Sequence, residues 1–228
     1  MKRFILYIVF LFLLGSLSPV SAQTDKDNVI IKAMQDELRR NMEQLSLPKV
    51  QKPFFISYAT EASHHFEITA TLGAITRSTE KPNQLVGSVK LLLGDYKENS
   101  DSRYLGRHTR VILSMEPDYD LLRQDYWLAT DYAYKNASRE WITKRSMQKR
   151  NVQTDEETRL PDLVQIEARE KIITPQVPFV YNREQWEDNL RVLSAIFASY
   201  PELYNSSVQL SGTDMEVYLT TSEGSVVK

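Results

Sequence analysis

The sequence predicts an α+β fold in which an antiparallel sheet carries one long helix and two shorter amphipathic helices. Three segments repeat apolar residues at helical spacing, at about residues 28–45, 120–149 and 183–200. Runs between them alternate apolar and polar residues, which is typical of strands with one face exposed to water. Because the first strands follow one another through short turns, we expect an antiparallel meander.

The first helix is expected to begin at about Asp25 or Asn28 and to end before Leu47-Pro48. One face carries charged residues and the other is apolar, so the apolar face is expected to pack on the sheet. The apolar residues are Ile30, Met34, Leu38, Met42 and Leu45.

Three strands are predicted after this helix, at residues 53–60, 65–76 and 84–94. The second strand alternates most regularly, with Phe66, Ile68, Ala70 and Leu72 on one face. A polar loop and a short strand-like segment follow, at residues 97–107 and 109–115.

The longest helix is predicted at residues 120–149 and has small residues in the middle of its apolar stripe. Small side chains let a helix lie close to a sheet, so this helix is expected to cross the sheet. Basic residues at its end suit the negative end of the helix dipole. The acidic residues 155–157 follow directly, which favours a solvated helix end over a nucleic-acid surface. The stripe consists of Leu122, Tyr126, Ala129, Ala133, Ala137 and Trp141.

The last part of the chain reads as a long connection at 151–181, a helix at 183–200, and strands at about 204–212 and 215–221. The helix is expected to bury a stripe of Trp186, Leu190, Leu193, Ile196 and Phe197. Residues 222–224 supply a turn, and a return strand at 225–227 is short. An edge strand of this kind indicates the front part of something larger, truncated at its carboxy-terminal end.

Residues 1–22 are interpreted as a signal peptide, and residues 23–228 as a single domain. Lys2 and Arg3 precede an apolar run, and a small-x-small pattern ends at Ala22. Cleavage there predicts an exported protein, periplasmic or extracellular, without a stable membrane span. Removing Lys2 and Arg3 leaves 26 basic residues against 30 acidic ones, which gives no basic surface for nucleic acid. The chain has no cysteine, so a disulfide framework and cysteine zinc sites are excluded.

The few candidate site residues favour structural roles over chemistry. His64, His65 and Glu67 cluster, but adjacent residues of a strand point to opposite faces and cannot chelate one ion. His108 is isolated, and Asp95 after Gly94 is typical of a turn. No Gly-x-Ser-x-Gly frame surrounds the serine at 222. We therefore assign no catalytic, cofactor-binding or metal residue, and an unrelated hydrolase is the weakest reading.

Aromatic residues on the long helix are a further candidate, because such rings can stack on bases or sugars. Their helical spacing favours a role in the core or an interface instead. These residues are Tyr126, Trp127, Tyr132, Tyr134 and Trp141.

The ordered set of segments resembles the amino-terminal domain of the TldD/PmbA metallopeptidase family, in particular its exported branch. The resemblance covers about residues 28–227 and includes no single diagnostic motif. The segments that carry it are 29–45, 52–58, 70–74, 89–96, 122–135, 193–197 and 221–224.

The resemblance implies a role in proteolysis without a catalytic site in this chain. The family's zinc helix, His-Glu-x-x-x-His, belongs to a carboxy-terminal domain and is not in this sequence. Zinc is therefore expected only in a missing domain, and the chain alone is expected to be inactive. The family's dimeric architecture implies a homodimer or a catalytic partner subunit, and an extended peptide as substrate.

We accordingly expect a non-catalytic amino-terminal domain that helps to wall a peptide-binding chamber. The alternative is a free-standing periplasmic module that binds a peptide or a protein. A peptide can add a strand to a sheet edge. The candidate edges are the strand at 215–221 and the first strand.

Overall fold

The computed structural model describes residues 20–101, 108–149, 160–173, 180–203 and 205–228. The fold is α+β, as predicted, with a mostly antiparallel sheet in the order β3-β2-β1-β5-β6-β4. The helices are α2 (Val20–Gln44), α3 (Tyr119–Gln148) and α5 (Arg183–Ala195), the last followed by a 3-10 turn (Ile196–Ser199). The strands are β1 (Pro53–Thr71), β2 (Ala74–Leu93), β3 (Thr109–Ile112), β4 (Glu170–Lys171), β5 (Val208–Thr221) and β6 (Val226–Val227).

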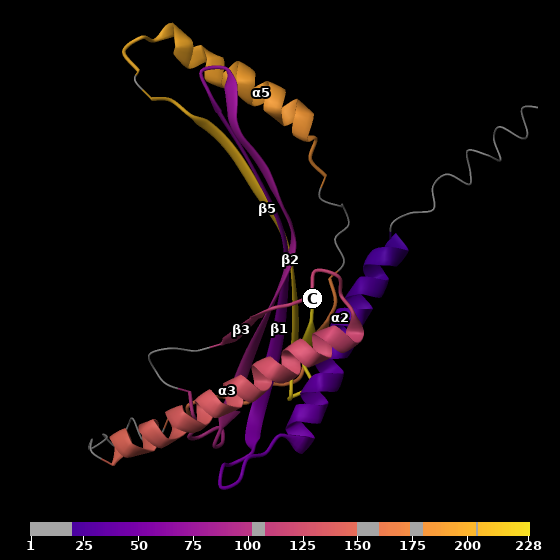
Figure 1. Ribbon diagram of the computed structural model, residues 1–228. Helices are drawn as coiled ribbons and strands as arrows, with labels where there is room; N and C mark the ends of the chain where they lie inside the picture. Colours follow the sequence, from indigo (N-terminus) through magenta and orange to yellow (C-terminus); the bar gives the residue numbers. More distant parts are fainter. Residues whose placement is uncertain (1–19, 102–107, 150–159, 174–179, 204) are drawn as a thin grey trace, which may run out of the picture.

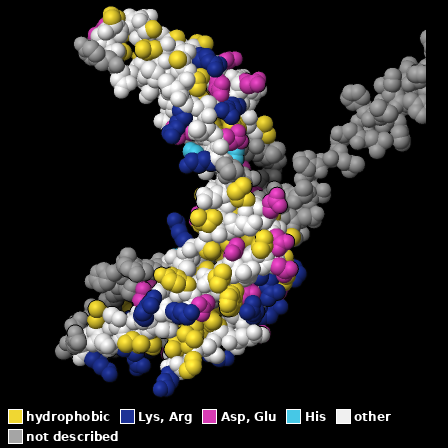
Figure 2. All heavy atoms as spheres, in the orientation of Figure 1, with side chains coloured by type: hydrophobic (Ala, Val, Ile, Leu, Met, Phe, Trp, Pro, Cys, Tyr) yellow, Lys and Arg dark blue, Asp and Glu magenta, His cyan; other side chains and the backbone are white. Residues whose placement is uncertain are grey.

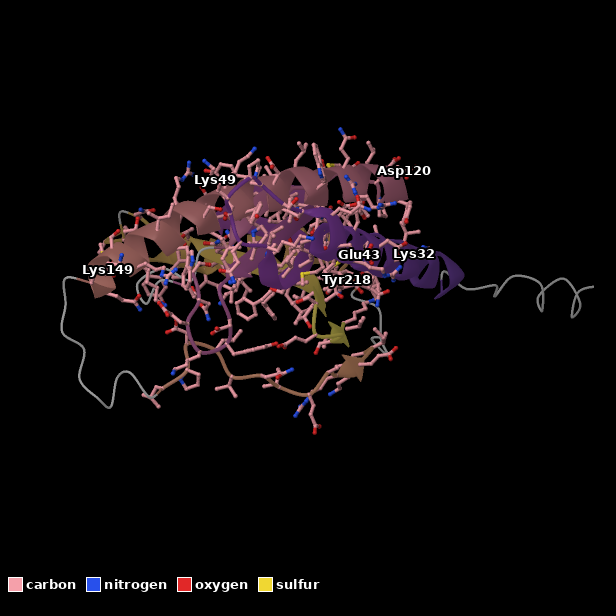
Figure 3. The ribbon with its side chains drawn as sticks, turned by 90° about the horizontal axis from the view of Figure 1, so that it is seen from below. Lys32, Glu43, Lys49, Asp120, Lys149 and Tyr218 are labelled. Atoms are coloured by element: carbon pink, nitrogen blue, oxygen red, sulfur yellow. The ribbon has the colours of Figure 1, made fainter. Side chains whose placement is uncertain are left out.

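The sheet is long and curved, and its two ends are covered by different helices (Figure 1). Helices α2 and α3 cover one end, where they lie side by side (Figures 1 and 3). Helix α5 covers the far end, near the turn between β1 and β2. We call these ends the base and the tip. The middle of the sheet between them is the narrowest part of the molecule, and we call it the waist (Figure 2).

The meander of three short strands was wrong. Residues 53–60 and 65–71 belong to one continuous strand, β1, which turns back at Leu72-Gly73 into β2, a strand one residue longer. The pairing of β1 with β5 runs through residues 61–64 without a break, although the pairing with β2 shifts register between Ser63 and His65. The two strands predicted at 204–212 and 215–221 likewise form one strand, β5.

The base holds the main hydrophobic core, which α2, α3, β1 and β2 build together. The predicted stripe of α3 is confirmed, because Leu122, Ala129 and Ala133 are buried. The rings of Tyr58 and Tyr126 stack at 4.5 Å between the sheet and α3. Their burial raises the pKa of both hydroxyl groups above the ordinary tyrosine value.

A buried carboxylate ties the two helices of the base to each other. Glu37 of α2 is fully buried, and its Oε1 accepts hydrogen bonds from Asn41 Nδ2 at 3.0 Å and Arg40 Nη1 at 3.2 Å. Its Oε2 accepts one from Arg123 Nε of α3 at 3.2 Å. Asn41 Nδ2 also donates to the Tyr58 hydroxyl at 2.9 Å, which connects the carboxylate to the sheet. This network fixes how α2 and α3 sit on β1.

The tip has a small second core of Ile68, Ala70 and Leu190. The predicted burial of the α5 stripe was mostly wrong, because Trp186, Leu193 and Ile196 are 40–56% exposed. At the tip, the described part of the sheet consists of β2, β1 and β5. This narrow surface buries little of α5 beyond the side chain of Leu190. Polar contacts therefore hold much of α5, with Arg183 Nε donating to Ser78 Oγ at 3.0 Å and Ser194 Oγ accepting from Gly73 N at 3.0 Å.

The turn at the tip is strained at one residue. Both turn residues have positive φ, 49° at Leu72 and 85° at Gly73, and leucine rarely adopts this conformation. We expect Leu72→Asn to raise the free energy of unfolding by about 0.5–1 kcal/mol, because asparagine tolerates this region and the Leu72 side chain is mostly exposed. Urea denaturation followed by circular dichroism measures the change, and a loss of stability would contradict it.

The Glu37 network makes a second prediction. Glu37→Ala leaves the Arg123 guanidinium, which is 29% exposed, without its carboxylate partner, so it should cost about 1–3 kcal/mol of stability. Asp131→Ala is the matched control on the surface of α3, where the ion pair with Lys135 is exposed and should contribute under about 0.5 kcal/mol. Equal losses in the two variants, measured by urea denaturation, would show that the buried network is not what holds the helices.

Candidate functional site

Strand β5 is paired along its full length on one side and along only a short part on the other. It pairs with β1 from Val208 to Thr221. On its opposite side it pairs with β6 only at Leu219 and Thr220. Residues 208–218 therefore form a long edge that no other described strand covers. We call this stretch the open edge.

Two turn contacts show which backbone groups face outward at the open edge. Ser222 N donates to Ile56 O of β1 at 2.8 Å, whereas Thr221 N donates to Ser225 O on the β6 side at 3.0 Å. Because these directions alternate along a strand, even-numbered residues bond β1 and odd-numbered residues point outward. The outward N–H and C=O groups belong to Gln209, Ser211, Thr213, Met215 and Val217.

The outward residues carry none of the side chains that usually protect a sheet edge. None of the five is charged, and none is proline, although charges and prolines are common protective devices. The side chains of Met215 and Val217 are 57% and 43% exposed. On the other face of the strand, Asp214 is exposed and Glu216 forms an ion pair with Lys228 at 3.0 Å.

The waist behind the open edge is built from aromatic and polar contacts. The ring of Phe66 lies over Gly212, where a Cβ atom would come within 2.3 Å of it. Tyr181, which precedes α5, stacks on Phe66 with the ring centroids 3.9 Å apart. Glycine is thus required at position 212, and the ring of Phe66 fills the space that its missing side chain leaves.

The histidines lie at the waist, and their predicted separation is confirmed. His64 and His65 are neighbours on β1, so their side chains lie on opposite faces of the sheet. His64 Nε2 lies 2.7 Å from Glu80 Oε1, and this contact lowers the pKa of Glu80. His65 Nδ1 lies 2.9 Å from Thr213 Oγ1 on β5.

The remaining acidic candidates form structural contacts. Glu67 accepts a hydrogen bond from Arg77 at 3.1 Å and is not near His64. Asp95 Oδ1 accepts from the backbone N of Lys97 and of Glu98, both at 2.8 Å, which confirms its turn role. Partial burial lowers the pKa of His108. Within the described ranges, no three His, Cys, Asp or Glu residues lie close enough to hold a metal ion.

The aromatic residues of α3 divide between the core and the surface. Tyr126 and Tyr134 are fully buried, which agrees with the core interpretation, and Trp141 packs against the core. Trp127 and Tyr132 are 40% and 58% exposed. Only the exposed rings of this set are therefore accessible for stacking on a base or a sugar.

Of the two edges predicted for strand addition, one was wrong. The first strand, β1, lies in the middle of the sheet between β2 and β5. The strand at 215–221 does lie at an edge, but Leu219 and Thr220 are paired with β6. Residues 209–212 of the open edge were predicted as part of a separate strand at about 204–212, but not as an edge. The uncharged residues at alternate positions from Gln209 onward could have indicated one continuous edge strand. The break that was assumed before residue 215 hid this pattern.

The predicted hairpin at residues 215–227 is confirmed, with its turn at residues 222–224. The return strand β6 is not an exposed edge, because β4 pairs with it in parallel at Glu170 and Lys171. Tyr96 donates a hydrogen bond to Glu223 in the turn, which holds the hairpin against the loop after β2. Whether the chain is truncated stays a prediction.

No family model and no curated protein matches the chain. Among solved structures, TldE from Thermococcus kodakarensis is similar with a TM-score of 0.46 and 10% identity, over 86% of this chain and 36% of that chain. TM0727 from Thermotoga maritima, named as a proposed modulator of a DNA gyrase, is similar with a TM-score of 0.37 and 8% identity, over 76% and 32%.

Both neighbours are proteins of the TldD/PmbA family, the family that the sequence resembles. The chain spans about a third of the length of each. Similarity at these TM-scores concerns the path of the chain and says nothing about its activity.

The predicted signal peptide lies outside the described residues, except for Val20 to Ala22 at the start of α2. Among the helices of the described ranges, none is long and apolar enough to cross a bilayer.

The backbone directions in β5 predict an alternating pattern of amide exchange. The amides of Gln209, Ser211, Thr213, Met215 and Val217 should exchange with solvent about 100-fold or more faster than those of Leu210, Gly212 and Asp214, which bond to β1. Hydrogen exchange followed residue by residue by NMR measures both sets. Uniform protection along β5 would show that the outer edge is covered.

Proposed function

We propose that this chain is a non-catalytic TldD/PmbA-like domain that helps to wall a peptide-binding chamber in an exported protein. In this proposal an extended polypeptide pairs with β5 at the open edge. The observation that carries the proposal is the row of outward backbone groups from Gln209 to Val217. A polypeptide strand is the ligand that satisfies alternating N–H and C=O groups along one edge.

The geometry of β5 suits strand addition because β1 already holds the strand extended and in register. Fourteen consecutive pairs link the two strands without a register shift. An added strand would therefore meet a preformed edge and would have to order only itself. The exposed side chains of Met215 and Val217 would lose contact with water as the strand docks.

In this proposal, peptide binding and peptide-bond chemistry belong to different parts of the protein, because this sequence contains no candidate catalytic or metal-binding motif. Peptide-bond chemistry, including any zinc, would belong to a carboxy-terminal domain or a partner subunit, and this chain would supply the surface that positions the peptide. Export rests on residues 1–22, whose charge and apolar pattern are those of a signal peptide.

A free-standing binding module is the second candidate, and one observation favours it. The hairpin that ends in β6 is covered by β4 instead of standing open. A module of this kind would bind its peptide without any other subunit. A chamber wall would bind the isolated peptide weakly and would tighten its hold when a catalytic partner is added.

Strand addition is tested most sharply by removing one outward N–H. Met215→Pro removes that donor without breaking a bond to β1, since the Met215 amide points outward. We expect it to weaken binding of a fluorescein-labelled ten-residue peptide of alternating valine and threonine by about tenfold. Fluorescence anisotropy measures the affinity. Met215→Thr is the matched control, because it removes the same side chain but keeps the N–H group.

A second probe alters the peptide instead of the protein, so its result does not depend on whether the Met215→Pro variant folds. The same peptide with N-methyl groups on alternate amides should bind the unaltered chain about tenfold more weakly when the methyl groups face β5. Equal binding of the methylated and unmethylated peptides would show that the edge does not accept a strand.

A further inference from the structure

We propose that the open edge selects an extended segment in which basic residues alternate with apolar residues. This inference rests on the proposed function, since it assumes that a strand pairs with β5. It concerns which strand is preferred, and the two faces of β5 carry it independently. One face offers an acidic position and the other offers an apolar pair.

The acidic position is Asp214. Its side chain is exposed and makes no hydrogen bond or ion pair with any other described residue. Its N–H and C=O groups bond to β1, so it would sit in a non-hydrogen-bonded pair with an added strand. Side chains in such pairs are the closest in an antiparallel sheet, with Cα atoms about 4.5 Å apart. A lysine or arginine opposite Asp214 would therefore meet its carboxylate directly.

Among the described residues, the neighbouring charges leave this carboxylate without a counter-ion. His64 lies directly across from Asp214 on β1, but its Nε2 is engaged by Glu80. Glu216, the next residue on the same face, is paired with Lys228. Lys81 lies across from His65 and therefore on the opposite face of the sheet. The local charge that an added strand would meet on this face is negative.

The opposite face of the open edge is apolar where it is most exposed. Met215 and Val217 lie on the same face, two residues apart, and both are outward residues. Apolar side chains of an added strand would lie beside them in hydrogen-bonded pairs, and β-branched residues suit such positions. Because successive side chains of a strand alternate between faces, basic and apolar preferences alternate along the bound segment.

The test compares three labelled ten-residue peptides that differ only on one face. Each has valine at alternate positions, and the intervening positions are all lysine, all glutamate or all threonine. We expect the full chain at low ionic strength to bind the lysine peptide at least about fivefold more tightly than the glutamate peptide. Asp214→Asn should reduce this preference by about two- to fivefold and leave the threonine peptide unaffected, and Asp214→Lys should reverse it. Asp131→Asn, the same change on α3, is the matched control.

The outcomes separate this inference from the proposed function. Equal affinity for the lysine and glutamate peptides, with the N-methylated probe still weakened, would overturn the charge selection and leave strand addition intact. No binding of any of the three peptides would overturn both. If amide protection along residues 209–217 rises with protein concentration in the absence of peptide, a second copy occupies the edge, and the peptide selection is wrong.

Discussion

The antiparallel pairing of β1 with both of its neighbours is the constraint on which the rest of the structure depends. β1 bonds β2 on one side and β5 on the other over nearly its whole length, so it sets the register of both. The core of the base packs on the face of β1 that includes Tyr58 and Ala62, and α5 packs on the same strand at the tip. The open edge exists because β1 holds β5 in register while, among the described strands, only β6 pairs with its other side, and only at Leu219 and Thr220.

The two ends of the sheet are stabilised by different means, and we infer that they differ in how easily they open. The base combines a large apolar core with the buried carboxylate of Glu37, whose partners come from both α2 and α3. The tip has only a small core and relies on polar contacts such as those of Arg183 with Ser78. The larger core of the base fixes the register of β5 at that end. Because the tip has the smaller core, we infer that β5 opens locally most easily at the tip.

The sequence predicted the elements better than their connections. The stripe from Leu122 to Ala137 could be read because helical spacing and small residues leave a strong pattern. The hairpin turn at Leu72 could not, since a leucine with positive φ contradicts local preference, and only the surrounding pairing imposes it. The open edge could not be predicted either, because whether a strand lies inside or at the side of a sheet is decided by long-range pairing. Asp214 therefore fell between the two strands predicted at about 204–212 and 215–221.

The proposed function requires that a polypeptide strand pairs with β5 at its outer side. The most direct measurement is an isotope-edited NOE experiment with the labelled chain and the unlabelled peptide of alternating lysine and valine. Strand pairing at this edge should give cross-strand NOEs from peptide protons to the amides of Ser211, Thr213 and Met215, and none to the amides of Gly212 and Asp214 that face β1. Peptide NOEs confined to α3 or to the exposed apolar residues of α5, with none to β5, would contradict it.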